Sequence, residues 1–449
     1  MKNRDAFLDT IDRKLGKRKL IWFGARGEDA QPLLAIPQFS EVFSLIAPFG
    51  SVSVEVDACL ETMRQSRMDL DTYSLDADHS SQAQALRRCL LESLKSSAAI
   101  LPYRPLGFLS SVYYPRRGHV KYLGLFHERQ APFEHKPWVE SELRDLGLRT
   151  LPWRYFSDED RQRFEDELEA LGSLVLRTNR SDGGAGLSLI QSKADLELHW
   201  HGHSDGFFAA APHLVPHVPL NVNACVFPDG QVTLHGPSIQ LIGIAECTQR
   251  LFGYCGNDFA AVRYIDDGHL NDLDEMVRTV GRWLASKGYI GAFGVDAMIS
   301  GGSVYLTEVN PRFQGSSTLS ALLDEELERA DVFLAHIGAF FNLSPQKSES
   351  LCEIARLQSP SAQIICHNIM PINCRLEPGG RLAVSGGHLY LVPAPAIEIE
   401  KEAILFKVIV RKGVTKDGLS LSRSSRELIG TFAKANFSPA PATAVGAMS

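Results

Sequence analysis

The sequence predicts an α/β protein with more than one domain. Its 449 residues, 44% of them hydrophobic, are enough to fill two to four cores at roughly 150 residues per domain. In the first part of the chain, short apolar runs alternate with helical stretches, a pattern typical of a parallel sheet covered by helices. The last part of the chain is rich in strands instead.

The first 129 residues are predicted to form an N-terminal α/β domain. Phe7, Ile11 and Leu15 recur at helical spacing, and the apolar run KLIWFGARG that follows is punctuated by glycine. Apolar runs at 51–56, 98–103 and 120–126 predict further strands. An amphipathic helix is expected at 81–95.

Residues 130–349 are predicted to form the central domain. Helices are expected at 134–148 and 158–172, and two strands joined by a glycine-rich connection at 174–190. The segment PLNVNACVFPDGQVTLHG has the pattern of a β-hairpin with Asp229 and Gly230 at its turn. A helix that ends near Gly288 and two more strands complete this part.

Residues 350–449 are predicted to form a strand-rich C-terminal domain. Its strands are QIICHNIMPINCRL, GGHLYLVPA and AILFKVIVRKG, and a short helix, SRELIGTFAKA, follows them. The composition of the tail NFSPAPATAVGAMS predicts disorder.

Charge and composition favour small-molecule partners. The formal net charge of -7 gives no basic excess for nucleic acid, and no lysine-rich block suggests an anionic membrane. No apolar run has the length of a signal peptide core or approaches the ~18 residues of a membrane span. The eight cysteines form no C-x-x-C pair, so we expect reduced thiols and a cytoplasmic protein.

A polar group of residues ends the strand-like segment SVYLTEVNPR. Strand alternation places Val304, Leu306, Glu308 and Asn310 on one face. The oxygens of Glu308 and Asn310 could hold magnesium, which proteins bind through one or two carboxylates together with phosphates. The alternative is a solvated strand face that ends at a proline.

Asp296, on the preceding predicted strand, can join this site only if the register allows it. A two-residue turn at Gly301 and Gly302 would pair Asp296 with Thr307, on the wrong face. We therefore expect a three-residue connection that also includes Ser303, or else a bulge that shifts the register by one.

The segments 294–312 and 174–190 together resemble the metal-binding end and the glycine-rich lid hairpin of the ATP-grasp fold. This resemblance implies an ATP site with a lid at about 153–219. A lysine on a helix before the lid, a cation on its first strand and an Asp, Glu and Asn trio grip ATP and magnesium in that family. Lys136, Arg177, Asp296, Glu308 and Asn310 match those positions in turn.

In the lid loop, Gly183, Gly184 and Gly186 let backbone amides approach phosphate, and Ser181 and Ala185 complete the loop. An ordinary glycine turn explains the loop equally well on local grounds. The family generally has lysine where this chain has Arg177, so the charge is kept but its shape becomes a planar fork.

Other polar stretches carry weaker signals. His213 and Leu214 occupy the place of the family's adenine-binding strand, although a packing role explains His213 as well. His199, His201 and His203 alternate as three zinc ligands on one strand face would, but we interpret them as an exposed polar face. Ser238 and Gln240 precede a loop that lies near the substrate in related ligases, and a packing role is equally open.

The resemblance implies a carboxylate-amine ligase that forms an amide or peptide bond through an acyl phosphate and releases ADP and phosphate. It implies ATP with two Mg²⁺ ions, for which Mn²⁺ could substitute, and Arg312 as the catalytic clamp on the acyl phosphate. The expected substrates are an amino acid or peptide of specialised metabolism, and a homodimer is compatible with the family. A nucleotide-binding module without turnover and a carboxylase component are the alternatives, although the chain has no Met-Lys-Met biotinylation segment.

Overall fold

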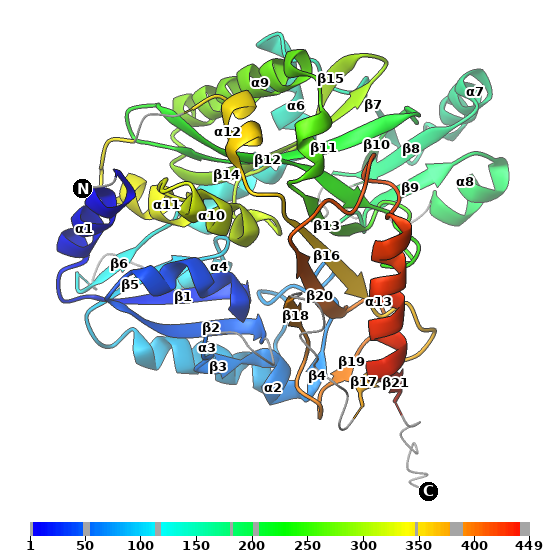
Figure 1. Cartoon of the computed structure of the whole chain (residues 1–449). Helices are drawn as coiled ribbons and strands as arrows, with labels where there is room; N and C mark the ends of the chain where they lie inside the picture. Colours follow the sequence, from blue (N-terminus) through cyan, green and yellow to red (C-terminus); the bar gives the residue numbers. More distant parts are fainter. Residues whose placement is uncertain are drawn as a thin grey trace, which may run out of the picture.

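The computed structural model describes residues 3–47, 54–112, 118–179, 183–200, 206–345, 349–377 and 389–440. Figure 1 shows four sheets with their covering helices: the N-terminal sheet (blue), a large sheet above it (green to orange), the lid to one side, and a small sheet beside the C-terminal helix. Within the described ranges, no helix combines the length and the apolar character that crossing a bilayer requires.

The N-terminal sheet is fully parallel, as the alternation of apolar runs and helices predicts. Its strand order is β3-β2-β1-β5-β6. The strands are β1 (Lys19–Arg26), β2 (Phe39–Ile46), β3 (Ala58–Cys59), β5 (Ala98–Pro102) and β6 (Val120–Tyr122). The segment 51–56 was expected to be a strand, but residues 54–56 are outside any strand and 51–53 lie outside the described residues.

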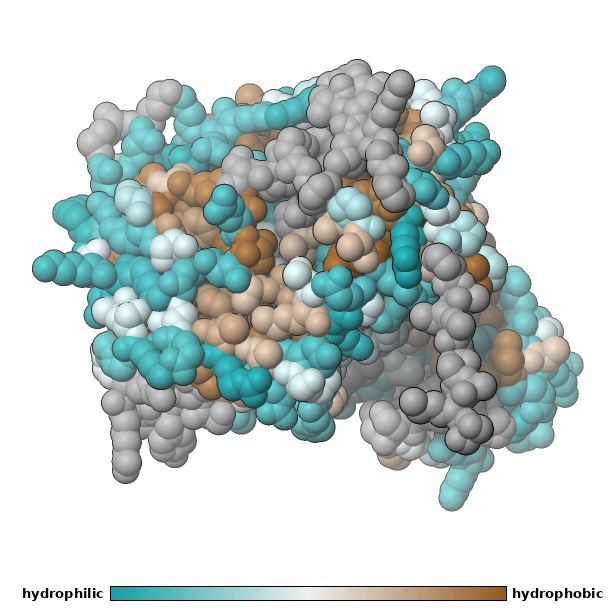
Figure 2. All heavy atoms as spheres, turned by 90° about the horizontal axis from the view of Figure 1, so that it is seen from below, coloured by the Kyte–Doolittle hydropathy of each residue, from teal (hydrophilic) through white to brown (hydrophobic). Residues whose placement is uncertain are grey.

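Helices cover both faces of this sheet and bury its β-branched and aromatic side chains in two cores. One core joins the sheet to α1 and α11, and the other joins it to α3. The helices of this part are α1 (Asn3–Leu15), η1 (Gly27–Ala35), α2 (Leu60–Arg64), α3 (Ser81–Ser93), α4 (Gly107–Val112), α5 (His127–Gln130) and η2 (Ala131–Glu134). On the side of β2 and α3, hydrophilic residues cover much of the surface and apolar ones gather in a central area (Figure 2).

The lid is a four-stranded antiparallel sheet with order β7-β10-β8-β9. Its own core of aromatic rings, including Phe156, Phe164 and Trp200, lies between this sheet and two helices. The lid consists of β7 (Arg154–Ser157), α7 (Arg161–Leu171), β8 (Leu174–Thr178), β9 (Leu187–Ile190), α8 (Lys193–His199) and β10 (Phe207–Pro212).

The large sheet is antiparallel and runs β15-β14-β11-β12-β13-β16-β20-β18. It continues across residue 350, so the C-terminal strands extend the sheet of the central segment. The strands are β11 (His217–Val226), β12 (Val232–Ile242), β13 (Tyr254–Asp258), β14 (Gly291–Ser300), β15 (Ser303–Asn310), β16 (Ala362–His367), β18 (Leu389–Leu391) and β20 (Ile404–Val410). The predicted hairpin at 219–236 is confirmed by the pairing of β11 with β12.

Helices pack on this sheet through a core that includes Val277, Val280 and Leu284 of α9. They are α6 (Lys136–Asp145), η3 (Ala261–Tyr264), α9 (Asp267–Ser286), α10 (Ser317–Glu326), α11 (Val332–Phe340) and α12 (Leu351–Leu357).

A small sheet joins one strand of the N-terminal part to three strands of the C-terminal part, with order β21-β17-β19-β4. Its members, with the neighbouring helix, are β4 (Ser66–Arg67), β17 (Cys374–Leu376), β19 (Glu398–Ile399), α13 (Arg423–Asn436) and β21 (Phe437–Pro439). The expectation that the tail is disordered from Asn436 onward is wrong for Phe437–Pro439, because these residues pair with β17. Residues 441–449 lie outside the described residues.

Candidate functional site

A cavity of about 350 Å³ lies where the lid, the large sheet and the N-terminal sheet meet. Ligand pockets commonly begin at about this size. Lys136, Arg177, Asp296, Glu308 and Arg312 line it, so the fold brings together side chains that lie far apart in the sequence.

Asp296 and Glu308 face the cavity side by side because a bulge corrects the register of β14 and β15. Gly301 and Gly302 form a two-residue turn in which Ser300 pairs with Ser303, so the expected three-residue connection is wrong. The register then shifts between Asp296 and Ala297, which pairs Asp296 with Glu308, as the bulge alternative predicts.

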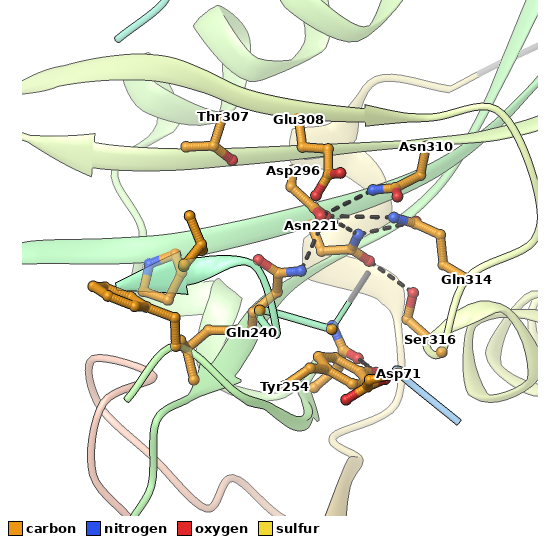
Figure 3. A pocket seen from close by; sticks show the side chains of 18 of the residues that line it. Asp71, Asn221, Gln240, Tyr254, Asp296, Thr307, Glu308, Asn310, Gln314 and Ser316 are labelled. Carbon is orange, nitrogen blue, oxygen red and sulfur yellow. Dashed lines mark hydrogen bonds between the residues drawn. The ribbon is translucent and has the colours of Figure 1, made fainter. Parts of the chain in front are cut away.

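The bulge also changes which residues of β15 share a face. Val304 and Leu306 pack in the core under the sheet, whereas Thr307, Glu308 and Asn310 line the cavity (Figure 3). The expected single face of Val304, Leu306, Glu308 and Asn310 is therefore wrong. Thr307 is an extra residue between Leu306 and Glu308, and it breaks the alternation of the strand. Val304 and Leu306 therefore face away from Glu308 and Asn310.

A cage of amide groups surrounds the Asp296 carboxylate (Figure 3). Oδ1 accepts hydrogen bonds from Asn221 Nδ2 at 2.7 Å and Gln240 Nε2 at 3.0 Å, and Gln314 Nε2 lies 3.4 Å away. Oδ2 accepts one from Asn310 Nδ2 at 3.0 Å. Burial and the charge of Glu308 raise the pKa of Asp296 to about 6, and the amide hydrogen bonds oppose the rise.

Two cations complete this end of the cavity. Lys136 is the first residue of α6, and its Nζ lies 3.0 Å from Glu308 Oε1. Arg312 Nε lies 4.0 Å from Glu134 Oε1, and its Nη1 donates to the carbonyl of Phe313 at 3.4 Å. Lys136 thus reaches the carboxylate pair from a distant part of the sequence, whereas Arg312 follows Glu308 by four residues and acts on Asp296 through its charge.

The donor set fits a hard divalent cation that is shared with phosphates. Within the described part of the chain, no three His, Cys, Asp or Glu side chains gather as a complete metal site. Two carboxylates and an amide oxygen are nevertheless the set that magnesium uses when phosphates supply its remaining ligands. A cation between Asp296 and Glu308 would also relieve the repulsion that raises the pKa of Asp296.

The glycine loop of the lid lies against both other walls of the cavity. A Cβ at Gly183 would lie 2.1 Å from the Asp71 carboxylate, and one at Gly184 would lie 2.1 Å from the carbonyl oxygen of Phe252. Ala185 and Gly186 lie in the turn between β8 and β9, where Gly186 O accepts from Thr178 N at 3.0 Å. Ser181 lies outside the described residues.

Arg177 lines the cavity, but an acidic residue holds its guanidinium. Nη2 donates to Glu140 Oε2 at 3.0 Å, Nη1 contacts Glu140 Oε1, and the guanidinium stacks on the indole of Trp153 at 3.9 Å. Tyr155 also donates to Glu140 at 2.7 Å. Arg177 therefore contributes less net positive charge to the cavity than the sequence suggests.

His213 and Leu214 line the apolar part of the cavity, where a flat ring could lie against Val175 and Ala211. Leu214 O accepts a hydrogen bond from His217 Nδ1 at 2.7 Å, so this carbonyl is already in use. Burial and the neighbouring His217 lower the pKa of His213.

The strand interpretation of His199 is wrong. His199 ends helix α8, which Ser192 caps by accepting a hydrogen bond from Asp195 N, and His201 and His203 lie outside the described residues. Of the other two candidates, Gln240 binds Asp296, whereas Ser238 is buried and accepts from Asn257 Nδ2 at 3.0 Å.

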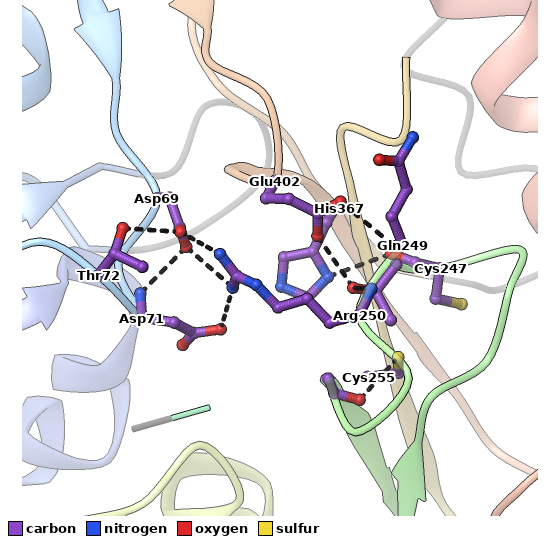
Figure 4. Close-up of polar contacts among 11 residues, drawn as sticks. Asp69, Asp71, Thr72, Cys247, Gln249, Arg250, Cys255, His367 and Glu402 are labelled. Atoms are coloured by element: carbon purple, nitrogen blue, oxygen red, sulfur yellow. Dashed lines mark hydrogen bonds and ion pairs between the residues drawn. The ribbon is translucent and has the colours of Figure 1, made fainter. Parts of the chain in front are cut away.

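Sequence reasoning missed a network of ion pairs and hydrogen bonds around Arg250, which Figure 4 shows. Arg250 forms ion pairs with Asp69 and Asp71 of the N-terminal part, the second at 3.0 Å. Glu402 anchors the same loop by accepting from Thr248 Oγ1 at 3.0 Å and Gln249 N at 3.2 Å. No local pattern marks these residues, but the alternation of Asn221 and Asn223 with apolar neighbours on β11 could have identified Asn221.

Comparison with known proteins finds both a matching domain and similar folds. A family model described as an ATP-grasp domain matches residues 231–316. The formate-dependent phosphoribosylglycinamide formyltransferase of Vibrio vulnificus is 26% identical over 205 residues, which cover 45% of this chain and 49% of that protein. The protein of the same name from Bacteroides fragilis is 24% identical over 232 residues, covering 49% and 55%.

Solved structures share the fold over nearly the whole chain. A biotin carboxylase from Campylobacter jejuni matches with a TM-score of 0.62 and 14% identity, covering 94% of this chain and 92% of that one. The N5-carboxyaminoimidazole synthetase of Staphylococcus aureus in complex with ADP matches with a TM-score of 0.55 and 14% identity, covering 93% and 98%. Residues 231–316 thus match an ATP-grasp domain, and the chain as a whole shares the fold of these structures. It spans about half the length of the curated relatives that it matches.

Proposed function

We propose that this protein is a cytoplasmic ATP-dependent ligase that joins a carboxylate to an amine through an acyl phosphate. The observation that carries the proposal is the convergence of Asp296, Glu308 and Asn310 with Lys136 and Arg312 at one end of a cavity closed by a glycine loop. The match to an ATP-grasp domain supports a nucleotide there.

The side chains divide the work of positioning and charge neutralisation. Lys136 and the amides of Gly183 and Gly184 would hold the phosphates, and the apolar wall at His213 and Leu214 would receive adenine. Asp296, Glu308 and Asn310 would hold two Mg²⁺ ions, for which Mn²⁺ could substitute. Magnesium, when bound, neutralises phosphate charge.

Arg312 would act on the reacting group itself. A guanidinium can bind two oxygens at once, so Arg312 can hold the carboxylate while it attacks the γ-phosphate and then hold the acyl phosphate. The lid excludes water from this reactive mixed anhydride when it closes. Positioning in this way converts a bimolecular attack into an effectively unimolecular one.

The finer proposal is that the substrates are an amino acid or peptide of specialised metabolism, and that an amide or peptide bond is formed. Residues 1–129 would contribute the substrate wall, 130–349 the nucleotide site and 350–449 the outer edge of the large sheet. The apolar and aromatic wall formed by Leu45, Tyr103 and Ile365 supports a small organic acid.

ADP release from ATP and Mg²⁺, measured with arrays of carboxylates and amines, tests the proposal. Wild-type protein should release ADP only when a matching pair is present, and Glu308→Gln should not. ATP binding without ADP release for any pair would favour a nucleotide-binding module without turnover. ADP release with bicarbonate and biotin alone would favour a carboxylase component.

A further inference from the structure

Arg26 lies at the end of β1, where it lines the same cavity as the metal-side carboxylates. Its side chain is only 8% exposed. It donates one hydrogen bond, from Nε to Asp29 Oδ2 at 2.8 Å, and Thr318 Oγ1 in turn donates to Asp29 Oδ1 at 2.8 Å. Asp29 therefore fixes the guanidinium by one nitrogen.

One terminal nitrogen of this guanidinium is left for another partner. Nη2 is buried and has no hydrogen-bond partner among the described residues. A guanidinium carries five N–H donors and stays charged, and leaving its donors unmatched in a buried site is costly. Such a group is expected to find an anionic acceptor in the cavity that it lines.

Tyr254 lines the cavity together with Arg26 and Asp296. Tyr254 experiences both the positive charge of Arg26 and the negative charge of Asp296, so its phenol lies within electrostatic range of both. The ring of Tyr254 packs against Gly315, where a Cβ would lie 2.6 Å from it.

Buried groups of both charge signs surround Arg26. Asp29 and Glu28 act on Arg26, and the buried Lys407 adds a second positive charge within their range. Burial and the negative charge of Asp29 raise the pKa of Glu28, and burial and the positive charge of Arg26 lower the pKa of Lys407. The charges of this group therefore offset one another, and it is the Nη2 donor of Arg26, unmatched in the described part of the chain, that calls for an acceptor.

We propose that Arg26 binds a second anionic group of the acid substrate, a carboxylate or a phosphate ester, while the first carboxylate lies at Arg312 for phosphorylation. This inference rests on the proposed function and specifies its substrate class: acids with two negative groups, spaced by a short body that contacts Tyr254. Arg26 is then a specificity-determining residue, because acids with one negative group leave its donors unpaired.

The test compares paired acids in the ADP-release assay: alkanoic acids, the matching alkanedioic acids, and hydroxy acids with and without a phosphate ester. The dicarboxylate and phosphate-ester arms distinguish the two sources of the second charge. The variants are Arg26→Gln and Arg26→Lys. Arg18→Gln is the matched control, because Arg18 lies on the N-terminal part outside the cavity lining.

For acids with two anionic groups, Arg26→Gln should raise KM about 10- to 100-fold, the value of a charged hydrogen bond, with kcat changed less than about threefold. Arg26→Lys should recover part of this loss, and Arg18→Gln should show none of it. Equal KM values for acids with one and two anionic groups in wild type would overturn the inference while leaving the ligase function intact. A KM of Arg26→Gln for acids with two anionic groups that is no higher than the KM of Arg18→Gln would also overturn the inference.

A binding measurement separates this inference from the proposed reaction. With the nucleotide site, including its γ-phosphate position, saturated by the magnesium complex of a non-hydrolysable ATP analogue, inorganic phosphate should raise the Tm of wild type and of Arg18→Gln but not that of Arg26→Gln. If no acid supports ADP release, the ligase proposal fails, and this titration still decides whether Arg26 binds an anion. Equal Tm shifts in all three proteins would overturn the Arg26 site.

Discussion

Gly183→Ala should hinder lid closure because the added methyl group meets the N-terminal wall of the cavity. A Cβ at Gly183 would lie 2.1, 2.2 and 2.3 Å from the three carboxyl atoms of Asp71, where ordinary contacts begin at 3.4 Å. The loop or Asp71 must therefore move by about 1 Å, a misplacement that can cost on the order of 100-fold in rate. The positive φ of 57° adds a strain of about 1–2 kcal/mol.

Gly301→Ala is the matched control, because Gly301 has a φ of 55° but no atom within 4 Å of its Cβ position. ADP release at varied ATP should show a loss of about 100-fold in kcat/KM for Gly183→Ala and little change for Gly301→Ala. In the Asp71→Ala background, which lacks the clashing carboxylate, Gly183→Ala should cost much less activity than it does in wild type. The reasoning is refuted if the two glycine-to-alanine variants differ by less than about threefold, or if Gly183→Ala costs as much activity without Asp71 as with it.

Three further predictions follow from single residues. Glu308→Gln should lower kcat by at least about 100-fold and leave the Tm near that of wild type, because Glu308 lines the cavity and is not part of the core. Normal ATP consumption by this variant would show that Glu308 is not a metal ligand. Arg312→Lys should reduce kcat by about 10- to 100-fold with ATP affinity nearly unchanged, as measured by steady-state kinetics and nucleotide titration, because the fork matters where charge develops; an unchanged kcat contradicts this. Asp331 accepts from Phe333 N and Leu334 N at the start of α11, and burial raises its pKa to about 7. The folded protein thus holds a proton that the unfolded chain releases above about pH 4, so this contribution to stability is present at low pH and is lost as pH rises toward 7. Asp331→Asn keeps the capping oxygen and cannot ionise, so its free energy of unfolding relative to wild type should rise by about 1–3 kcal/mol between pH 4 and pH 8. Urea unfolding at both pH values measures this, and a difference that does not change with pH contradicts it.

Features that depend on local pattern could be predicted from the sequence. The hairpin of β11 and β12 follows from the Asp229-Gly230 turn between alternating strands, and α7 ends at Gly172, which adopts a positive φ. The parallel N-terminal sheet follows from alternating helices and apolar runs.

Features that depend on distant contacts could not be predicted. The bulge at Thr307 reverses which neighbours share the face of Glu308, and nothing in the local sequence distinguishes it from a longer turn. The amides of Asn221, Gln240 and Gln314 reach Asp296 from three separate elements.

The charge distribution of the site could not be predicted from the sequence either. Arg177 was identified as a phosphate-binding cation, but its partner Glu140 lies on a helix before the lid. Arg26 was passed over, because its role depends on the burial that the large sheet and the N-terminal sheet create together.

Transfer of labelled oxygen from the acid to phosphate tests the central claim most directly. An acyl phosphate forms when a carboxylate oxygen attacks the γ-phosphate, and the amine then displaces that oxygen together with the phosphate group. With an acid identified in the ADP-release screen and labelled with ¹⁸O in its carboxylate, the account predicts one ¹⁸O atom in each inorganic phosphate released, measured by mass spectrometry. Phosphate that carries no label, released with ADP at the same rate as the coupled product, would contradict it.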